Sequence, residues 1–153
     1  MLFIRQYQPR DQAIIEELHV VGLQQAGAYA GDGPWDDDVR DIPGAYLARR
    51  GEFLVGEVGG AVVAMGAVRP LTPTRGEIKR MRVHPPMHGR GYGRQMLLAL
   101  EDRARALGYR ELELETSEQQ IAAQQLYRAG GFVEFKRGPW LGFNCIWFEK
   151  TLG

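Results

Sequence analysis

His88-Gly89-Arg90-Gly91-Tyr92-Gly93-Arg94 is the stretch that decides how this chain folds. Three glycines at alternate positions free the backbone to approach a bulky partner closely. Behind them, small or apolar residues recur at the alternating spacings of four and three that mark one face of a helix: Gly93, Leu97, Leu100, Ala104 and Leu107. The sequence therefore predicts a glycine-rich loop that runs into a helix over residues 91–107. At such a helix start, unpaired N–H groups and the helix dipole favour an anion, most often a phosphate.

The charges around this loop also point to an anionic ligand. The chain carries 19 Lys+Arg and 19 Asp+Glu, yet no acidic residue lies between Ile78 and Leu100. The basic residues of that window are Lys79, Arg80, Arg82, Arg90 and Arg94, with His84 and His88 beside them. A local basic patch in a neutral protein predicts one specific anionic ligand. It argues against nucleic-acid binding, which needs a broader basic surface.

Two common nucleotide-binding loops match this stretch poorly. A nucleotide-hydrolase phosphate loop ends in Lys followed by Ser or Thr, whereas Arg94-Gln95 follow the glycines here. A dinucleotide fingerprint reads Gly-x-Gly-x-x-Gly in a first strand–helix unit, whereas the order here is Gly89-x-Gly91-x-Gly93. A glycine-rich turn that only starts a helix stays as the simpler alternative, and the flanking arginines favour a ligand over it.

Composition is that of an ordinary soluble globular domain. Hydrophobic residues make up 44% of the 153 residues and charged residues 25%, and this length predicts a single domain over residues 1–153. No apolar run reaches the ~20 residues of a membrane span, and the N-terminus lacks the pattern of a signal peptide. A cytoplasmic location without membrane association is the expectation that follows.

Cysteine and histidine usage predicts neither disulfides nor metals. Cys145 is the single cysteine, so no intrachain disulfide can form, and its apolar surroundings predict a small buried hydrophobic side chain. His19, His84 and His88 show no metal-ligand spacing with one another or with Cys145. We therefore expect no metal site.

Hydrophobic periodicity along the chain predicts a mixed α/β domain. Helices are expected from Pro9 to about Leu23 and over residues 35–41, 91–107 and 121–129. Strands are expected over residues 2–7, 53–58, 61–68, 76–83, 111–115, 132–135 and 145–151. Gly59-Gly60 predicts a tight hairpin turn between the second and third of these strands.

Two motifs, in order, resemble signatures of the GNAT superfamily of acetyl-CoA-dependent N-acetyltransferases. Arg82-Val83-His84-Pro85 and His88-Gly89-Arg90-Gly91-Tyr92-Gly93 resemble the Arg/Gln-x-x-Gly-x-Gly/Ala loop and the strand before it. Gln120-x-x-Ala123-x-x-Leu126-Tyr127, followed by Gly131-Phe132, resembles an Asn-x-x-Ala-x-x-Leu-Tyr helix followed by Gly-Phe. The resemblance covers nearly the whole chain. It implies one N-acetyltransferase domain with a GNAT-like α/β fold, in which helices flank a mixed sheet of six to seven strands.

The resemblance also implies a binding site for acetyl-CoA as cosubstrate. The pyrophosphate of CoA is expected on the backbone of the loop, formed by His88, Gly89, Arg90, Gly91, Tyr92, Gly93 and Arg94. The pantetheine arm is expected to pair, as an extra strand, with Met81 and Val83, and Gln120 is expected as a further contact. His88 stands where the family usually has Arg or Gln, and Gln120 stands where Asn is common.

Acetyl transfer to an amine requires a base, a donor to the oxyanion and an acid for the departing thiolate. The family motif makes Tyr127 the candidate acid, and a core aromatic is the alternative without the motif. Glu77 is the candidate base, with a solvated charge at a strand start as an equal alternative. The backbone N–H of Met81 is the oxyanion donor that the resemblance implies. Direct attack in a ternary complex, without an acyl-enzyme, is the expected route.

The acceptor is the least determined part of this interpretation. A primary amine, on a small molecule or as an exposed amino group, is the class expected. An acidic and aromatic segment is a candidate rim for a cationic amine: Tyr29, Asp32, Trp35, Asp36, Asp37, Asp38 and Asp41. A solvated loop and helix start is the simpler alternative for most of these aspartates.

Other functions and an assembly stay open at this stage. A non-catalytic acyl-CoA-binding module of the same fold is the main alternative function, and a nucleotide-binding regulator is a third. A homodimer is a further possibility. The apolar final strand, taken to include Trp140, Phe143, Trp147 and Phe148, serves either an interface or the core.

Overall fold

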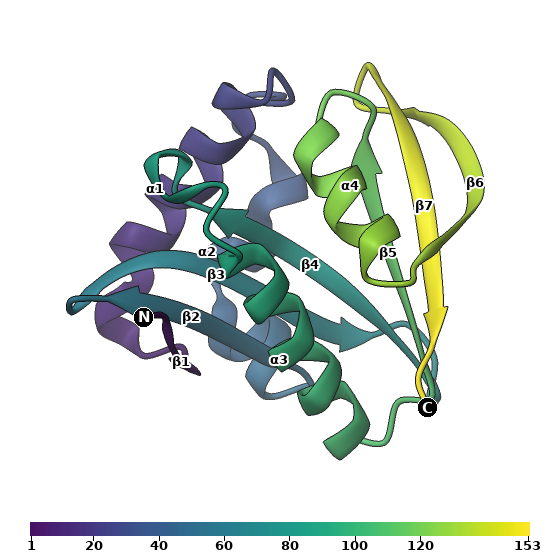
Figure 1. The fold of residues 1–153 in the computed structure, drawn as a ribbon, viewed down its shortest axis with the longest axis horizontal. Coiled ribbons are helices and arrows are strands. Elements are labelled where there is room, and N and C mark those ends of the chain that lie inside the picture. Colours follow the sequence, from purple (N-terminus) through teal and green to yellow (C-terminus); the bar gives the residue numbers. More distant parts are fainter.

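The computed structural model describes residues 1–153, with one seven-stranded sheet and helices on both of its faces (Figure 1). The strands are β1 Phe3–Gln6, β2 Glu52–Val58, β3 Ala61–Pro70, β4 Arg75–Val83, β5 Glu111–Ser117, β6 Val133–Trp140 and β7 Phe143–Thr151. The α-helices are α1 Gln12–Gln25, α2 Asp37–Arg40, α3 Tyr92–Ala106 and α4 Ile121–Ala129. Shorter 3-10 and π-helical turns span Pro9–Asp11, Pro34–Asp36, Pro43–Leu47 and Pro85–Met87. The predicted α/β class and mixed sheet are confirmed.

The sheet has the order β1-β2-β3-β4-β5-β7-β6. All neighbouring strands are antiparallel except β4 and β5, which are parallel and pair only from Arg75↔Glu111 to Glu77↔Glu113. Figure 1 shows these two strands together near the C-terminus and apart at the opposite end. β5 stays paired with β7 along its whole length. The edge of β4 that faces β5 has no strand partner beyond Glu77.

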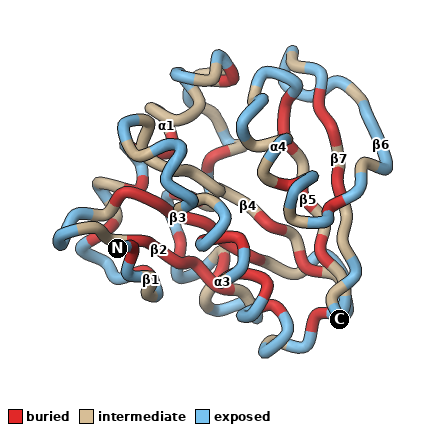
Figure 2. The backbone as a smooth tube through the Cα atoms, viewed as in Figure 1, coloured by how far each residue is buried: buried red, intermediate tan, exposed pale blue.

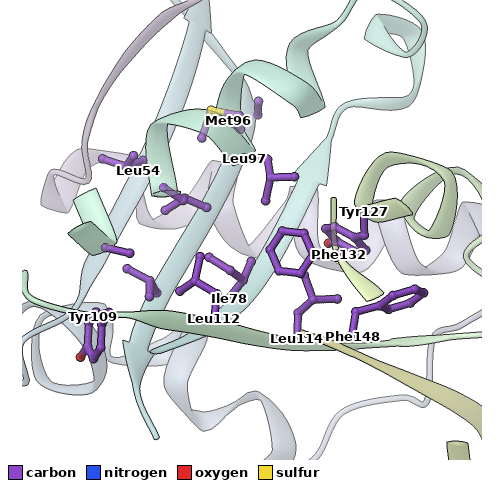
Figure 3. Packing of buried hydrophobic residues seen from close by; sticks show 14 of the residues in the cluster. Leu54, Ile78, Met96, Leu97, Tyr109, Leu112, Leu114, Tyr127, Phe132 and Phe148 are labelled. Carbon is purple, nitrogen blue, oxygen red and sulfur yellow. The ribbon is translucent and has the colours of Figure 1, made fainter. Parts of the chain in front are cut away.

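Two hydrophobic clusters lie on the two faces of this sheet. Strand residues alternate between faces, so Leu54 of β2 joins the cluster under α3, while Phe53 and Val55 join the cluster under α1 and α2. Helix α3 buries Leu97, Leu100 and Ala104 of the face that its sequence period predicts, and Met96 beside them. Figure 3 shows Met96 and Leu97 in this cluster. The central strands are therefore buried on both faces (Figure 2).

Arg80 interrupts the regular pairing of β4. Its φ of 60° is left-handed, and the register between β3 and β4 shifts at this point, so the strand carries a bulge. The guanidinium donates to Asp38 of α2, from Nε at 2.9 Å and from Nη2 at 2.5 Å, and to the carbonyl of Trp35 at 2.7 Å. Tyr46 donates a further hydrogen bond to Asp38. This buried pair ties the segment around α2 to the middle of the sheet.

The environment of Asp36 and Asp38 corrects one expectation. The solvated loop expected for most of the acidic segment describes Asp32, Asp37 and Asp41, which are exposed. It is wrong for Asp36, which pairs with His19 at 2.8 Å, and for Asp38. Burial opposes ionisation of Asp38, but the Arg80 hydrogen bonds outweigh it and hold the pKa of that carboxyl well below its usual range.

The C-terminal hairpin is longer than predicted. Residues 132–135 and 145–151 were the expected strands, whereas β6 and β7 extend to Trp140 and back to Phe143. Leu141 and Gly142 both have positive φ, which gives the tight turn whose twist matches the strands. Pro139 is tolerated because β6 is an edge strand. Trp140 therefore belongs to β6 and is 54% exposed, and Phe148 of the final strand is in the core.

None of the helices combines the length and the apolar composition that crossing a bilayer requires.

The pair formed by Arg80 and Asp38 can be tested with neighbouring aspartates. We expect Asp38→Asn to lower the free energy of unfolding by about 2–3 kcal/mol, because Arg80 is left buried without a full counter-charge. The Asp37 side chain is 74% exposed and that of Asp38 9%, so Asp37→Asn should cost less than about 0.5 kcal/mol. Urea denaturation of both variants measures the difference, and equal costs would contradict the assignment.

The same pair makes a prediction about pH. A carboxyl whose pKa is depressed by folding stabilises the folded state above its unfolded value, and this contribution is lost as the pH falls. The difference in stability between the wild type and Asp38→Asn should therefore be complete above about pH 4 and shrink below it. A difference that is constant down to about pH 2 would show that the charge of Asp38 is not the cause.

Candidate active site

The glycine-rich loop takes the conformation that its sequence predicts. Gly89 and Gly91 have φ of 77° and 82°, where side chains are disfavoured, and Gly91 caps the start of α3. Gly93 is needed for a different reason. A Cβ at this position would lie 3.3 Å from Cδ2 of Leu126, so its absence lets α3 and α4 approach closely.

The backbone amides of this loop are unused within the protein. His88 N–H donates to the carbonyl of Pro85 at 3.1 Å, and the next paired amide is that of Gln95, which donates to Gly91. The six consecutive amides in between, from Gly89 to Arg94, donate to no acceptor of the chain. Together with the positive end of the α3 dipole, they form a site for a phosphate-like anion.

A cavity of about 530 Å³ opens at this loop. Nine of the ten residues predicted to bind the cofactor line it: Met81, Val83, His88, Gly89, Gly91, Tyr92, Gly93, Arg94 and Gln120. Arg90 does not line it and is exposed outside the cavity. The remaining walls come from α4, which carries the second motif, and from the C-terminal part of α1, which the sequence did not single out. The cavity has the size of a cofactor or drug-sized ligand site.

The unpaired edge of β4 forms one wall of this cavity, and side chains already contact its carbonyls. The His88 ring donates from Nε2 to the carbonyl of Val83 at 2.8 Å. Arg82 donates from Nη1 to the carbonyl of Met81 at 2.8 Å. Each carbonyl keeps a second lone pair. The side chain of His88 therefore anchors the loop to β4. From the sequence, only the backbone of His88 was expected to have a role, as a contact to the pyrophosphate.

Gln120 has a structural contact as well as a place in the cavity wall. Its Oε1 accepts hydrogen bonds from Thr116 Oγ1 at 3.0 Å and from the backbone N–H of Ser117 at 3.1 Å. These bonds fix the turn between β5 and α4. The side-chain nitrogen Nε2 of Gln120 makes no hydrogen bond within the protein and stays available to a ligand.

Tyr127 lies where this cavity meets a second one. Its ring packs edge-on against Phe132, with centroids 5.9 Å apart, and against Phe148 at 6.2 Å (Figure 3). The hydroxyl makes no hydrogen bond with the protein. Burial raises the pKa of Tyr127 to about 12. The phenol is therefore protonated at neutral pH, and its proton is free for a ligand.

The second cavity, of about 440 Å³, lies on the side of α1 and α2. Met81, Arg82, Gln120 and Tyr127 line both cavities, so the two adjoin at these side chains. Glu77 also lines the second cavity. Its side chain is 15% exposed and accepts from Arg69 Nε at 2.8 Å, so the solvated charge considered as an alternative is wrong.

The predicted acidic and aromatic rim belongs to this second cavity. Tyr29, Trp35, Asp36, Asp37 and Asp38 line it, whereas Asp32 and Asp41 do not. Trp140 at the end of β6 and Phe143 at the start of β7 line it from the other side. Segments far apart in the sequence thus enclose one space.

The predicted basic patch does not gather at the loop. Arg80 is paired with Asp38, and Arg82 packs against Gly22 of α1. Only Arg90 and Arg94 are exposed beside the glycines. The reason is the alternation of β4 together with its bulge, which directs Lys79, Arg80 and Arg82 to the second cavity.

A family profile described as acetyltransferase (GNAT) family matches residues 16–132. This range includes the glycine-rich loop and the residues that line both cavities, Tyr127 among them. The chain belongs to the GNAT acetyltransferase family. It is thereby an acyltransferase. Among curated relatives, an IAA acetyltransferase of Azospirillum brasilense is 44% identical over 105 residues, which are 65% of this chain and 67% of that protein.

Other relatives of this GNAT protein are longer. N-acetyltransferase family 8 member 2 of Rattus norvegicus is 33% identical over 100 residues, which are 62% of this chain but only 44% of that protein. The segment matched by this chain is therefore less than half the length of such relatives.

Solved structures have the same fold. A GNAT family acetyltransferase of Staphylococcus aureus Mu50 matches with a TM-score of 0.91 at 20% identity, over 100% of both chains. A phosphinothricin acetyltransferase of Sinorhizobium meliloti, solved in complex with acetyl-CoA, matches with a TM-score of 0.80 at 20% identity, over 99% of this chain and 89% of that one. At these identities the likeness concerns the fold.

Sequence reasoning missed several residues of the site. Lys79, Arg82 and Glu115 line the second cavity, and none of them had been assigned a role in it. A signal was present for Arg82, because it is a charged residue between the apolar Met81 and Val83 in a strand of the sheet centre. No signal in the sequence alone places them in one cavity, because β4 and β5 are brought together by the sheet order.

Proposed function

We propose that residues 1–153 act as one N-acetyltransferase domain, which moves the acetyl group of acetyl-CoA to a primary amine by direct attack in a ternary complex. The observation that carries the proposal is the row of six free amides from Gly89 to Arg94. They open into a cavity that reaches Tyr127, where the second cavity begins. Donor and acceptor then approach Tyr127 from opposite sides.

The residues of the first cavity suit CoA. The free amides and Arg94 offer donors to a pyrophosphate, and the open edge of β4 at Met81 and Val83 offers backbone groups to the amides of a pantetheine arm. His88, Tyr92 and Gln120 complete this part of the proposal, and Arg90 contributes charge from outside the cavity. Acetyl-CoA supplies an activated thioester, and no metal is needed for its transfer.

Tyr127 is the proposed acid. A phenol that is protonated at neutral pH, and whose hydroxyl has no partner, can donate its proton to a departing thiolate. The N–H of Met81 is the proposed donor to the oxygen that gains negative charge. The packing that fixes the ring of Tyr127 supports its role as the acid, because a proton donor needs a defined position.

Glu77 is the proposed base. Oε1 accepts from Arg69, Oε2 makes no hydrogen bond within the protein, and the residue lines the second cavity. An amine must lose a proton to attack, and a carboxylate reaches it directly or through one water.

The remaining expectations are part of the same proposal. The acceptor is a small-molecule amine or an exposed amino group, and the protein works in the cytoplasm without nucleic acid, membrane or metal. A homodimer stays a prediction. Large exposed side chains at the end of the C-terminal hairpin, Trp140 and Leu141, are available to an interface.

A thermal-shift titration with acetyl-CoA, CoA, ATP and NAD tests the donor site first. A ligand that binds only the folded state stabilises it by RT ln(1 + [L]/Kd), about 2.7 kcal/mol at a hundredfold excess over Kd. We expect acetyl-CoA and CoA to raise the melting temperature, and ATP and NAD to leave it unchanged. A shift with ATP or NAD alone would instead favour a nucleotide-binding regulator.

Tyr127→Phe separates an enzyme from an acyl-CoA-binding module. If Tyr127 is the acid, the variant should lose about 10²-fold or more in kcat, because general acid catalysis contributes that much. Its CoA-induced thermal shift should be unchanged, because the ring packing is kept. Thiol release measures the rate. Unchanged turnover would remove Tyr127 from the mechanism, and no turnover in the wild type with any amine would favour the binding module.

Glu77→Gln tests the base in the same assay. We expect kcat to fall about tenfold to a hundredfold and the acidic limb of the pH–rate profile to flatten, because the group that must be deprotonated is gone. Arg10→Gln, on an exposed residue, is the control. A profile with its acidic limb intact would show that another group takes the proton.

A further inference from the structure

Four charged side chains of β4 line the second cavity, and only two of them have a counter-charge. Glu77 pairs with Arg69 at 2.8 Å, and Arg80 pairs with Asp38 at 2.5 Å. Lys79 and Arg82 form no ion pair with any carboxylate of the chain. The protein therefore holds two cations without counter-charges in one cavity.

Lys79 is the simpler of the two. Its ammonium makes neither a hydrogen bond nor an ion pair, and the side chain lies mostly out of solvent. Burial lowers the pKa of Lys79, and the charge of Arg80 lowers it further. The ammonium of Lys79 therefore has no partner in the protein and is available to a ligand anion.

Arg82 is confined more tightly. Its stem packs against α1, so that a Cβ on Gly22 would lie 2.9 Å from Cδ of the arginine. Nη1 donates to the carbonyl of Met81, whereas Nε is buried without any acceptor. Burial and the neighbouring Arg80 lower the pKa of Arg82 to about 10, which still leaves it charged at neutral pH. Most of its five donors are unused.

Glu115 supplies the opposite charge from the other wall. It lies on β5, beyond the last pair that β4 and β5 share, and it also lines the second cavity. It has no ion pair, although it is near enough to Arg82 and Tyr127 to influence their pKa values. The cavity thus presents two unpaired cations and one unpaired carboxylate beside Tyr127.

We propose that the acceptor is an amino-acid-like compound, whose carboxylate binds to Lys79 and Arg82 while Glu115 attracts its ammonium group. This inference rests on the proposed function and narrows its acceptor class. An arginine and a lysine together give a carboxylate charge-assisted hydrogen bonds, which are the stronger kind. An amine without an anionic group leaves both cations unpaired and is the poorer acceptor.

Matched acceptors test the carboxylate requirement. Phenylalanine, phenylalaninamide and phenethylamine share one side chain, and only the first carries a carboxylate; methionine and tryptophan are compared with their amides and decarboxylated amines in the same way. We expect the acids to exceed their partners in kcat/KM by about tenfold to a hundredfold, as hydrogen bonds to charged groups allow. Equal activity on acids and amides, or no activity on any acid, would overturn the inference.

Substitutions assign the effect to residues. Arg82→Met and Lys79→Met should each raise KM for the acids by about tenfold or more, with little change for the amides and amines that lack a carboxylate. Arg40→Gln, an exposed arginine of α2 outside the cavity, is the matched control and should change neither. Equal losses on acids and amines in both variants would overturn the assignment.

The CoA-induced thermal shift separates the possible failures. A variant that keeps this shift is folded and retains its donor site, and if Arg82→Met does not fold, Lys79→Met decides the question. A wild-type protein that shows no shift with CoA overturns the proposed function itself. A wild type that binds CoA and acetylates amines and acids alike overturns only the inference about the acceptor.

Discussion

The divergence of β4 from β5 is the constraint on which the rest of this structure depends. The two strands share only the pairs from Arg75 to Glu77, and beyond them β4 has a free edge. That opening makes room for a cavity on each side of Tyr127 and exposes the backbone at Met81 and Val83. A fully paired sheet would fill the same space with hydrogen bonds and leave no route between the two cavities.

The two sides of the opening are held apart by different means. On the loop side, the left-handed conformations of Gly89 and Gly91 and the close approach of α4 at Gly93 accompany six amides that are free of internal hydrogen bonds. On the other side, the bulge at Arg80 turns a guanidinium toward α2, where Asp38 and Trp35 bind it. Arg80 of β4 therefore stabilises the fold through its ion pair. Lys79 and Arg82 of the same strand have no ion pair.

The sequence was sufficient for the fold class and for the conformation of the glycine-rich loop because both depend on local patterns. Helical period, alternating strands and glycine spacing predict α3, the early hairpin and the loop, and these agree with the structure. The second cavity is different. Arg82 and Glu115 come from strands that are adjacent only through the sheet order, and the pairing of Arg80 with Asp38 joins residues 42 positions apart. The C-terminal hairpin was underestimated because Gly138 and Pro139 have low strand propensity, which the edge position overrides.

The two cavities are lined in part by different segments of the chain, which affects how this protein can evolve. The stretch from Ala28 to Asp38 and the hairpin end from Trp140 to Cys145 contribute to the second cavity and to no part of the first. Both are surface connections or strand ends outside the central strands and α3. Substitutions there can reshape the second cavity while the glycine-rich loop and its free amides stay intact. Under the proposed function, new acceptor specificities are thus open to gradual selection, with the cofactor site inherited unchanged.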